Sequence, residues 1–276
     1  MSASFGVVGC PVEHSLSPQI HHNFAAQQGI DLVYHKLAST EEQFEADLQR
    51  WLEHGFLGFN VTVPFKSTAT RFCDTLSAEA TLAGAVNTLH VAGGLHGDNT
   101  DGPGLVRDLT RRHGIKLAGK RLLIIGAGGA TRGILGPLLE QRPLTITIAN
   151  RTLSRAQALV DSFPGTRACS LHDWPQRGPF DLLIHATSAG HSQSIDMPKL
   201  KLTDTDCYDL SYGAAAAPFL QWARDCGARS ATDGLGMLVE QAALSFRIWH
   251  GRAPDTSAIY RQLRTQIDGD HSAHAD

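Results

Sequence analysis

Short apolar runs alternate with amphipathic segments along most of the chain. Strands of this kind are predicted over residues 5–9, 33–37, 56–63, 121–125, 144–149, 167–170, 181–185 and 206–210. Helices are predicted over residues 17–29, 41–54, 103–113 and 237–251. Ser17 is the expected N-cap of the first helix, with Pro18 in its first position and Gly29 as its stop. This alternation predicts an α/β fold that begins with an open α/β unit.

The most informative stretch is the junction at residues 121–132, where an apolar run breaks into glycines and then into a helical pattern. A buried parallel strand that feeds a helix has this pattern. Gly126 permits a tight turn, and Gly128 and Gly129 let backbone N–H groups approach a pyrophosphate at the positive end of the helix. A strict G-x-G-x-x-G motif would have glycine in place of Thr131. The loop predicts a dinucleotide site, although glycine turns after strands also occur without a ligand.

The end of the next predicted strand indicates which dinucleotide is bound. Sites for NAD usually carry Asp or Glu here, which hydrogen-bonds the ribose 2′-hydroxyl. This chain has Asn150, Arg151 and Thr152, with Arg155 one helical turn later. Guanidinium groups bind a 2′-phosphate through planar, bidentate contacts, whereas a carboxylate would repel it. NADP is favoured over NAD, and the alternative is that the two arginines only cover a solvated helix start.

Composition sets the class of protein. The 276 residues are 42% hydrophobic and 18% charged, with a net charge of −3, which describes a globular protein without a nucleic-acid partner. No apolar run is long enough to span a membrane, and the N-terminus lacks the pattern of a signal peptide. The five cysteines are scattered and the 14 histidines show no ligand spacing, so neither a disulfide framework nor a metal site is expected. Reduced thiols in a cytoplasm are the simplest account.

Four polar clusters lie outside the glycine loop, at residues 9–18, 60–66, 84–88 and 97–102. In the second cluster, alternation puts Asn60 and Thr62 on one face of a strand, near its carboxyl end, and Lys66 follows. The third reads as a strand with Asn87 near its middle. Each cluster also has a simpler interpretation, since serines cap helices, most lysines lie on the surface and Asx-rich glycine segments form turns.

Taken together, the motifs are similar to those of the shikimate dehydrogenase family. They are S-x-S-P at 15–18, N-V-T-V-P-F-K at 60–66, G-A-V-N-T at 84–88, D-N-T-D-G at 98–102, G-A-G-G-A at 126–130, N-R-T at 150–152, A-T-S-A-G at 186–190 and G-L-G-M-L-V-E-Q-A at 234–242. The matches follow in order from about residue 5 to 260. The resemblance implies a reversible, NADP-dependent reduction of 3-dehydroshikimate to shikimate in aromatic amino-acid biosynthesis.

The resemblance also implies roles for individual residues. Lys66 and Asp101 would form the catalytic pair. The implied substrate-binding residues are Ser15, Ser17, Asn60, Thr62, Asn87, Tyr212 and Gln241. The implied cofactor-binding residues are Gly126, Ala127, Gly128, Gly129, Ala130, Asn150, Arg151, Thr152, Arg155, Thr187, Ser188, Gly234 and Met237.

The expected organisation is a substrate-binding domain and a Rossmann-type NADP-binding domain. The substrate domain comprises residues 1–102 and 237–265, so that the C-terminal helices return to it, and the NADP domain comprises residues 103–236. Residues 266–276 are expected to be a disordered tail. The oligomeric state is not fixed by the sequence, and a homodimer is left open.

Two features depart from the family pattern. His185 stands where the family most often has asparagine, and residues 213–217 replace a stretch that is usually more polar. Two alternatives to the main function remain: a quinate/shikimate dehydrogenase with broader substrate or cofactor use, and, more distantly, a non-catalytic NADP-binding module. The second would be expected to lack Lys66 or Asp101, and both are present.

Overall fold

The computed structural model describes residues 3–187 and 197–272, with the side chains of residues 270–272 left out. Its strands are β1 Ala3–Gly9, β2 Leu32–Ala38, β3 Phe56–Val61, β4 Thr75–Leu76, β5 Thr88–Val91, β6 Leu95–Asp98, β7 Arg121–Ile125, β8 Thr145–Asn150, β9 Thr166–Ser170, β10 Leu182–His185, β11 Asp206–Asp209 and β12 Ser230–Thr232. Its α-helices are α1 Ser17–Gln28, α2 Phe44–Glu53, α3 Ala78–Ala83, α4 Asp101–Arg107, α5 Gly129–Glu140, α6 Leu153–Ser162, α7 Ala217–Asp225, α8 Leu235–His250 and α9 Ser257–Ser272.

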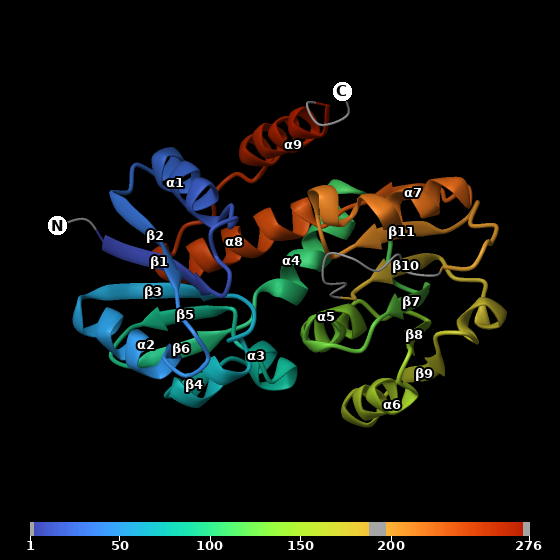
Figure 1. The fold of residues 1–276 in the computed structure, drawn as a ribbon, viewed down its shortest axis with the longest axis horizontal. Helices are drawn as coiled ribbons and strands as arrows, with labels where there is room; N and C mark the ends of the chain where they lie inside the picture. Colours follow the sequence, from blue (N-terminus) through green and yellow to red (C-terminus); the bar gives the residue numbers. More distant parts are fainter. Residues whose placement is uncertain (1–2, 188–196, 273–276) are drawn as a thin grey trace. The chain divides into compact units, whose positions relative to one another are not determined.

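The chain forms two compact units (Figure 1). The first consists of Met1–Gly104 with Leu238–Arg261, and the second of Leu105–Met237 with Gln262–Asp276. Most of helix α8 therefore returns to the N-terminal unit, as expected. The assignment of substrate and cofactor binding to residues 1–102 with 237–265 and to residues 103–236 stays a prediction.

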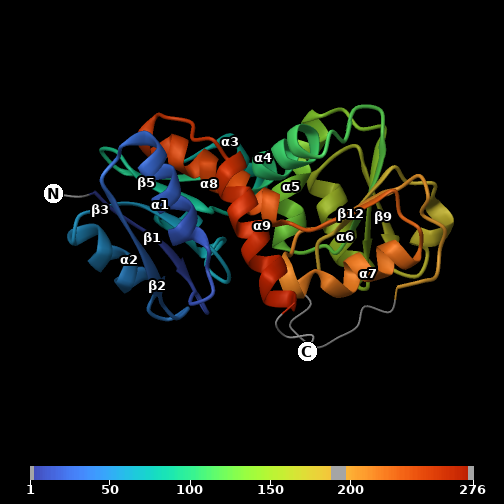
Figure 2. The same ribbon diagram turned by 90° about the horizontal axis from the view of Figure 1, so that it is seen from above.

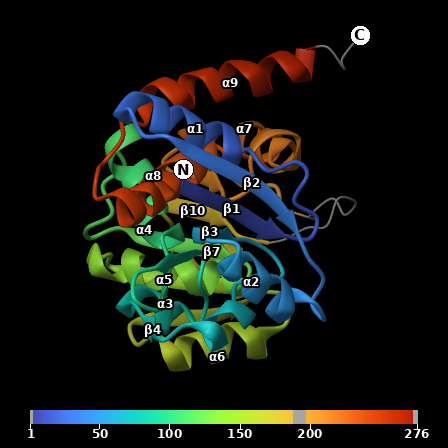
Figure 3. The same ribbon diagram turned by 90° about the vertical axis from the view of Figure 1, so that its left-hand side faces the viewer.

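The first unit is built on a mixed six-stranded sheet in the order β2-β1-β3-β5-β6-β4. Helices α1 and α8 cover one face, where Phe24 and Phe246 pack with ring centroids 5.7 Å apart (Figure 2). Helices α2 and α3 lie on the other side of the sheet (Figure 3), where Phe44 and Leu48 join a buried apolar cluster. Trp249 of α8 donates an indole hydrogen bond to the carbonyl of Leu89 at 2.9 Å, which ties this helix to β5.

The second unit is built on a fully parallel sheet in the order β9-β8-β7-β10-β11-β12. This is the doubly wound dinucleotide-binding order, with its reversal between β7 and β10. The apolar run predicted as a buried strand over residues 121–125 is strand β7, and its last four residues are buried. Leu122 and Ile124 enter the core beneath α5, and Leu123 and Ile125 enter the core beneath α7.

Several predicted boundaries are wrong. Strand β3 ends at Val61 rather than at residue 63, because the chain turns at Thr62 and leaves Val63 64% exposed. Helix α1 has Leu16 as its N-cap, so Ser17 is already helical. Gly29 ends the helix in the left-handed conformation, as predicted. Asn87 precedes strand β5 instead of lying within a strand.

The end of the chain also differs from the prediction. Helix α9 continues to Ser272, where a disordered tail was expected from residue 266. The Arg264 guanidinium hydrogen-bonds the carboxylate of Asp233, and Leu263 is fully buried, so the first half of the helix is anchored and the second half continues it.

Helix α1 buries a histidine whose ring nitrogens are without a hydrogen bond of normal geometry to any described residue. His21 is fully buried and stacks on Tyr34, with centroids 4.5 Å apart. Burial, only partly offset by the Asn60 side chain, lowers the pKa of His21 to about 3. The folded protein therefore requires a neutral imidazole at this position.

This requirement predicts a loss of stability in acid. Below the unfolded-state pKa of roughly 6.5, the unfolded chain binds a proton that the native state does not, so the free energy of unfolding falls by about 1.4 kcal/mol per pH unit. His21→Phe is expected to remove this contribution. Denaturant unfolding between pH 7.5 and pH 4.5 measures it, with the exposed neighbour His22→Phe as control. Equal pH slopes in the two variants would contradict the assignment.

Candidate functional site

The topology of the first unit brings two of the polar clusters to one edge of the sheet. Strands β1 and β3 are parallel neighbours, with Val8 paired to Val61. The segment carrying Ser15 and Ser17 follows β1, and the segment carrying Thr62 and Lys66 follows β3. Both segments leave the sheet at carboxyl ends of strands, which is where open α/β sheets bind ligands.

Lys66 and Asp101 form an ion pair. Lys66 Nζ lies 2.6 Å from Asp101 Oδ2, and the two side chains are 30% and 16% exposed. Asp101 opens helix α4, and its backbone N–H is held by the Asn99 side chain at 3.1 Å. The pair is therefore positioned by the backbone and still accessible to a small molecule, as acid–base chemistry on a substrate hydroxyl requires.

Asn87 connects this pair to the interior. Its side-chain nitrogen Nδ2 donates to Asp101 Oδ1 at 2.9 Å and to Gln241 Oε1 at 3.2 Å. Its side-chain oxygen Oδ1 accepts from the backbone N–H of Thr100 at 2.8 Å. Each oxygen of the Asp101 carboxylate thus has its own partner, so the carboxylate is held in one orientation and Lys66 with it.

The network continues to Asn60 through residues that sequence reasoning did not identify. The Thr88 and Ser245 hydroxyls lie 2.7 Å apart, and Asn60 donates to Ser245 at 2.9 Å. Tyr34 donates to Asn60 Oδ1 at 2.7 Å. Ser245 lies one helical turn after Gln241, and this spacing was the available indication of a shared polar face.

Tyr34 joins the network to the start of helix α1. Burial raises the pKa of its hydroxyl well above the ordinary value, against the influence of the Ser17 side chain hydrogen-bonded to it. The phenol stays neutral and able to donate. The Ser15 hydroxyl accepts from the backbone N–H of Ser17 at 3.3 Å. Five predicted substrate-site residues other than Lys66 and Asp101 lie at or near this network, namely Ser15, Ser17, Asn60, Asn87 and Gln241.

Thr62 packs beside the end of β1. Its backbone N–H donates to the carbonyl of Val8 at 2.9 Å, and a Cβ at Gly9 would collide with its methyl group. Tyr212, the remaining predicted substrate residue, belongs to the second unit, where burial and then the nearby Asp233 raise its pKa. Whether Tyr212 joins the other substrate residues stays a prediction.

In the second unit, the glycine loop has the geometry expected of an anion cradle. Gly126 has φ +115°, and a Cβ there would lie 2.8 Å from the carbonyl oxygen of Ala186, so only glycine fits. Among the described residues, Gly128 and Gly129 face open space, since a Cβ on either would have no atom of these residues within 4 Å. They begin helix α5, whose first N–H groups have no partner within the helix. Ala127 and Ala130 complete the loop.

Thr131 explains the missing third glycine. It is fully buried, and its hydroxyl donates to the carbonyl of Gly126 at 2.9 Å. The side chain therefore closes the loop from within and does not project toward the position of a ligand. The residue that replaces the third glycine of the strict motif thus stabilises the turn through a hydrogen bond.

The predicted phosphate-binding arginines follow strand β8. Asn150 donates to the carbonyl of Thr152 at 2.8 Å, which fixes the turn into helix α6. Arg151 and Arg155 are exposed, and no carboxylate forms an ion pair with either among the side chains that the structure describes. A pair of unneutralised guanidiniums at the start of a helix fits a bound phosphate better than it fits the helix dipole.

The neighbouring strand β10 ends in a hydrogen-bonded chain. Thr187 Oγ1 lies 2.5 Å from His185 Nε2, and His185 Nδ1 lies 2.9 Å from Asp209 Oδ2. Strands β7 and β10 are paired with His185 beside Ile125, so this chain of contacts lies next to the glycine loop. Ser188, also predicted to contact the cofactor, lies outside the described residues.

Two further cofactor candidates lie where helix α8 begins. A Cβ at Gly234 would collide with the carbonyl of Leu210, so this glycine is needed for close packing at the end of β11. Met237 packs partly buried against the main core of the unit. The described geometry gives a packing reason for both residues, and their contact with the cofactor stays a prediction.

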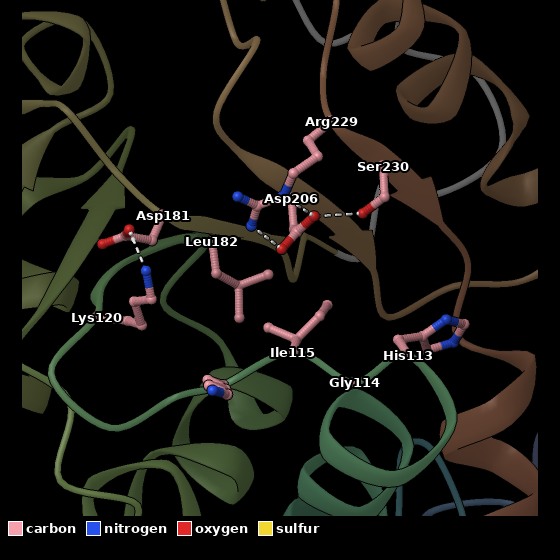
Figure 4. Close-up of a pocket in the computed structure, with 10 residues that line it drawn as sticks. His113, Gly114, Ile115, Lys120, Asp181, Leu182, Asp206, Arg229 and Ser230 are labelled. Atoms are coloured by element: carbon pink, nitrogen blue, oxygen red, sulfur yellow. Dashed lines mark hydrogen bonds and ion pairs between the residues drawn. The ribbon is translucent and has the colours of Figure 1, made fainter.

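A cavity of about 360 Å³ lies at the opposite end of the parallel sheet (Figure 4). It opens beside the starts of β10, β11 and β12, and its carboxylates are already paired. Lys120 Nζ lies 2.9 Å from Asp181, and Arg229 Nε donates to Asp206 at 2.9 Å. Ligands of doubly wound sheets bind at the carboxyl ends of the strands, so this cavity is not the predicted site.

Membrane-spanning and metal-binding features are both absent from the described residues. No helix in residues 3–187 and 197–272 is both long and apolar enough to cross a membrane. The same part of the chain has no group of three or more His, Cys, Asp or Glu side chains arranged to hold a metal ion.

Comparisons with known proteins cover almost the whole chain. Residues 7–89 match the shikimate dehydrogenase substrate binding domain, residues 108–196 match the shikimate/quinate 5-dehydrogenase model, and residues 234–264 match the shikimate 5′-dehydrogenase C-terminal domain. A shikimate dehydrogenase (NADP(+)) from Halorhodospira halophila is 49% identical over 270 residues, which cover 96% of this chain and 99% of the relative.

Solved structures of similar fold also cover nearly the whole chain. The shikimate 5-dehydrogenase from Thermus thermophilus, in complex with NADP(H) and shikimate, is 35% identical, with a TM-score of 0.82 and coverage of 95% of this chain and 99% of that one. The 5-ketofructose reductase of a Gluconobacter strain is 27% identical, with a TM-score of 0.82 and coverage of 96% and 99%. By sequence over nearly its full length and by fold, the chain belongs to the shikimate dehydrogenase family.

Proposed function

We propose that this protein catalyses the reversible NADPH-dependent reduction of 3-dehydroshikimate to shikimate, a step of aromatic amino-acid biosynthesis. The observation that carries the proposal is the Lys66–Asp101 pair, 2.6 Å apart and held by Asn87 in the first unit. A dehydrogenase for an alcohol needs a group that takes the hydroxyl proton in one direction and returns it in the other. The named activity of relatives at 46–49% identity supports the same reaction.

In this proposal Lys66 is the proton donor for reduction and the proton acceptor for oxidation. Asp101 orients the Lys66 ammonium and the reacting hydroxyl, and it compensates the ammonium charge. Asn60, Thr62, Asn87 and Gln241 hold the ring hydroxyls together with Asp101. The substrate carboxylate is held by Ser15 and Ser17, whose hydroxyls lie at the amino end of α1, with Tyr212 as a further contact.

The second unit fits NADP on its own chemistry. The open Gly128–Gly129 turn leaves room for a pyrophosphate against the first N–H groups of α5, and Arg151 and Arg155 carry charge with no carboxylate partner among the described side chains. Asn150 and Thr152 complete the 2′-phosphate site, and Thr187, Ser188, Gly234 and Met237 the nicotinamide side. The bound cofactor supplies the hydride, and the chain's own residues position it and favour NADP over NAD.

Steady-state kinetics with each pair of substrates test the proposal. Shikimate with NADP is expected to give the highest kcat/KM, and quinate or NAD to give at least about tenfold lower values, which corresponds to about 1.4 kcal/mol. The reverse direction is measured with 3-dehydroshikimate and NADPH. Absence of turnover with shikimate and NADP in a preparation that is folded by circular dichroism would refute the function.

A broader quinate/shikimate dehydrogenase is the second candidate, because the model matching residues 108–196 names both substrates. Similar kcat/KM values for shikimate and quinate would favour it. A cytoplasmic location and a homodimeric assembly are further parts of the proposal. Size-exclusion chromatography with light scattering measures the assembly.

A further inference from the structure

Thr187, His185 and Asp209 form a hydrogen-bonded chain at the end of strand β10. Its geometry determines which of its atoms carry protons. Asp209 Oδ1 accepts the backbone N–H of Ser211 at 2.8 Å, and Oδ2 faces His185 Nδ1 at 2.9 Å. A carboxylate only accepts hydrogen bonds, so the imidazole proton belongs on Nδ1. In a neutral ring Nε2 is then an acceptor, and among the described residues it faces the Thr187 hydroxyl at 2.5 Å.

The surroundings hold this arrangement in place. His185 is 4% exposed and Asp209 is 1% exposed. Phe219 stacks on the imidazole with centroids 4.9 Å apart and planes 12° from parallel, which restrains the ring from turning. The Thr187 hydroxyl is therefore expected to donate its single hydrogen bond to His185 Nε2. In other directions it can then only accept hydrogen bonds.

Thr187 lies where the cofactor is expected. A Cβ built on Gly126 would come within 3.1 Å of the Thr187 methyl group, so this residue packs directly against the glycine loop. Both belong to the carboxyl ends of β7 and β10, between which the strand order reverses. This reversal is the position at which doubly wound sheets bind dinucleotides.

We infer that His185 and Asp209 are positioning residues that make Thr187 an obligate hydrogen-bond acceptor toward the nicotinamide half of the cofactor. The partner group is a donor, either the carboxamide N–H or a ribose hydroxyl. The inference rests on the proposed function, because it requires the dinucleotide to bind at this loop.

Asp209→Asn tests the inference with one changed group. The Ser211 N–H keeps the amide oxygen in the place of Oδ1, so the NH₂ group faces His185 and can only donate to Nδ1. The imidazole proton moves to Nε2, which then donates to Thr187, and the threonine hydroxyl has to donate outward. A donor then faces a donor, and NADPH affinity is expected to fall about tenfold.

A double-mutant cycle separates this effect from general damage. Equilibrium binding of NADPH, followed by fluorescence without substrate, is measured for the wild type, Thr187→Val, Asp209→Asn and the double variant. Each single change is expected to weaken binding about tenfold, and the double variant no further. Thr187→Ser, which keeps the hydroxyl that Thr187→Val removes, is expected to bind NADPH with wild-type affinity. Asp206→Asn, a buried carboxylate at the other end of β11, is the matched control with unchanged affinity.

Two outcomes overturn the inference. One is unchanged affinity in Asp209→Asn, which means that His185 already donates to Thr187 in the wild type. The other is an Asp209→Asn effect of the same size in the Thr187→Val background, which marks Asp209 as structural only. Failure of the wild-type protein to bind NADPH would instead refute the proposed function.

A measurement on the wild type keeps the inference testable if Asp209→Asn does not fold. The ¹⁵N chemical shifts of the imidazole report the protonated nitrogen, and His185→Asn identifies the resonances by their loss. Protonation on Nδ1 alone is expected. Protonation on Nε2, or on both nitrogens, would contradict the inference without any reference to cofactor binding.

Discussion

Replacing Lys66 by alanine is expected to lower turnover by about 10²–10⁴-fold, the usual contribution of a positioned acid–base group. The reason is that the Lys66 ammonium, 2.6 Å from Asp101, is the proposed proton donor in the reduction. Binding of NADPH should be nearly unchanged, because Lys66 belongs to the first unit and the glycine loop to the second. Single-turnover kinetics and fluorescence titration measure the two quantities separately.

The matched control is Lys116→Ala, which removes an exposed lysine from the second unit. Asp101→Asn should also reduce kcat strongly. The double variant with Lys66→Ala should lose little more than the more affected single variant, because the two side chains act as one unit. Near-normal turnover in Lys66→Ala would remove it from the proposed role.

The second large effect is expected for Arg151→Ala, which should raise the KM for NADPH about 10–100-fold and leave the KM for NADH within about twofold. Only the phosphorylated cofactor makes the charge-assisted contact. Arg151 has no carboxylate partner in the described structure, so its removal leaves no buried charge behind. The measurement is a pair of Michaelis curves, one for each cofactor, at saturating 3-dehydroshikimate.

Arg167→Ala, on the exposed side of β9, is the control for loss of a positive charge. In the double variant Arg151→Ala/Arg155→Ala, the KM for NADPH should come even closer to the KM for NADH than in Arg151→Ala. Equal increases in KM for NADPH and NADH in Arg151→Ala would mean that this arginine does not bind the 2′-phosphate.

Much of the fold could be predicted from periodicity. The parallel strands of the second unit are continuous apolar runs, and the predicted strand over residues 121–125 matches Arg121–Ile125 residue by residue. The short strands β4 and β12 were not identified, because two or three residues carry no recognisable period. Helix α9 is anchored at its middle by the Arg264–Asp233 pair, a long-range contact that local composition does not contain.

The site was predicted less evenly. Lys66, Asp101 and Asn87 lie in recognisable motifs, and the structure brings them into direct contact. Tyr34 and Ser245 were missed because each lies in an otherwise ordinary strand or helix, and only tertiary packing brings them to Asn60. The backbone of Asn87 still pairs with Asp98 and Val61, one residue before the strand begins. Its side chain also accepts the Thr100 N–H, a tertiary contact that could not be anticipated from the local sequence.

The network from Lys66 to Tyr34 has a consequence for the thermodynamics of substrate binding. Its side chains are hydrogen-bonded to one another, so contacts within the protein fix their rotamers. Each side chain that is ordered on binding would otherwise take about 0.5–1.5 kcal/mol from the affinity. The first unit should therefore bind its substrate with a small loss of conformational entropy, as a rigid template whose shape selects the ring.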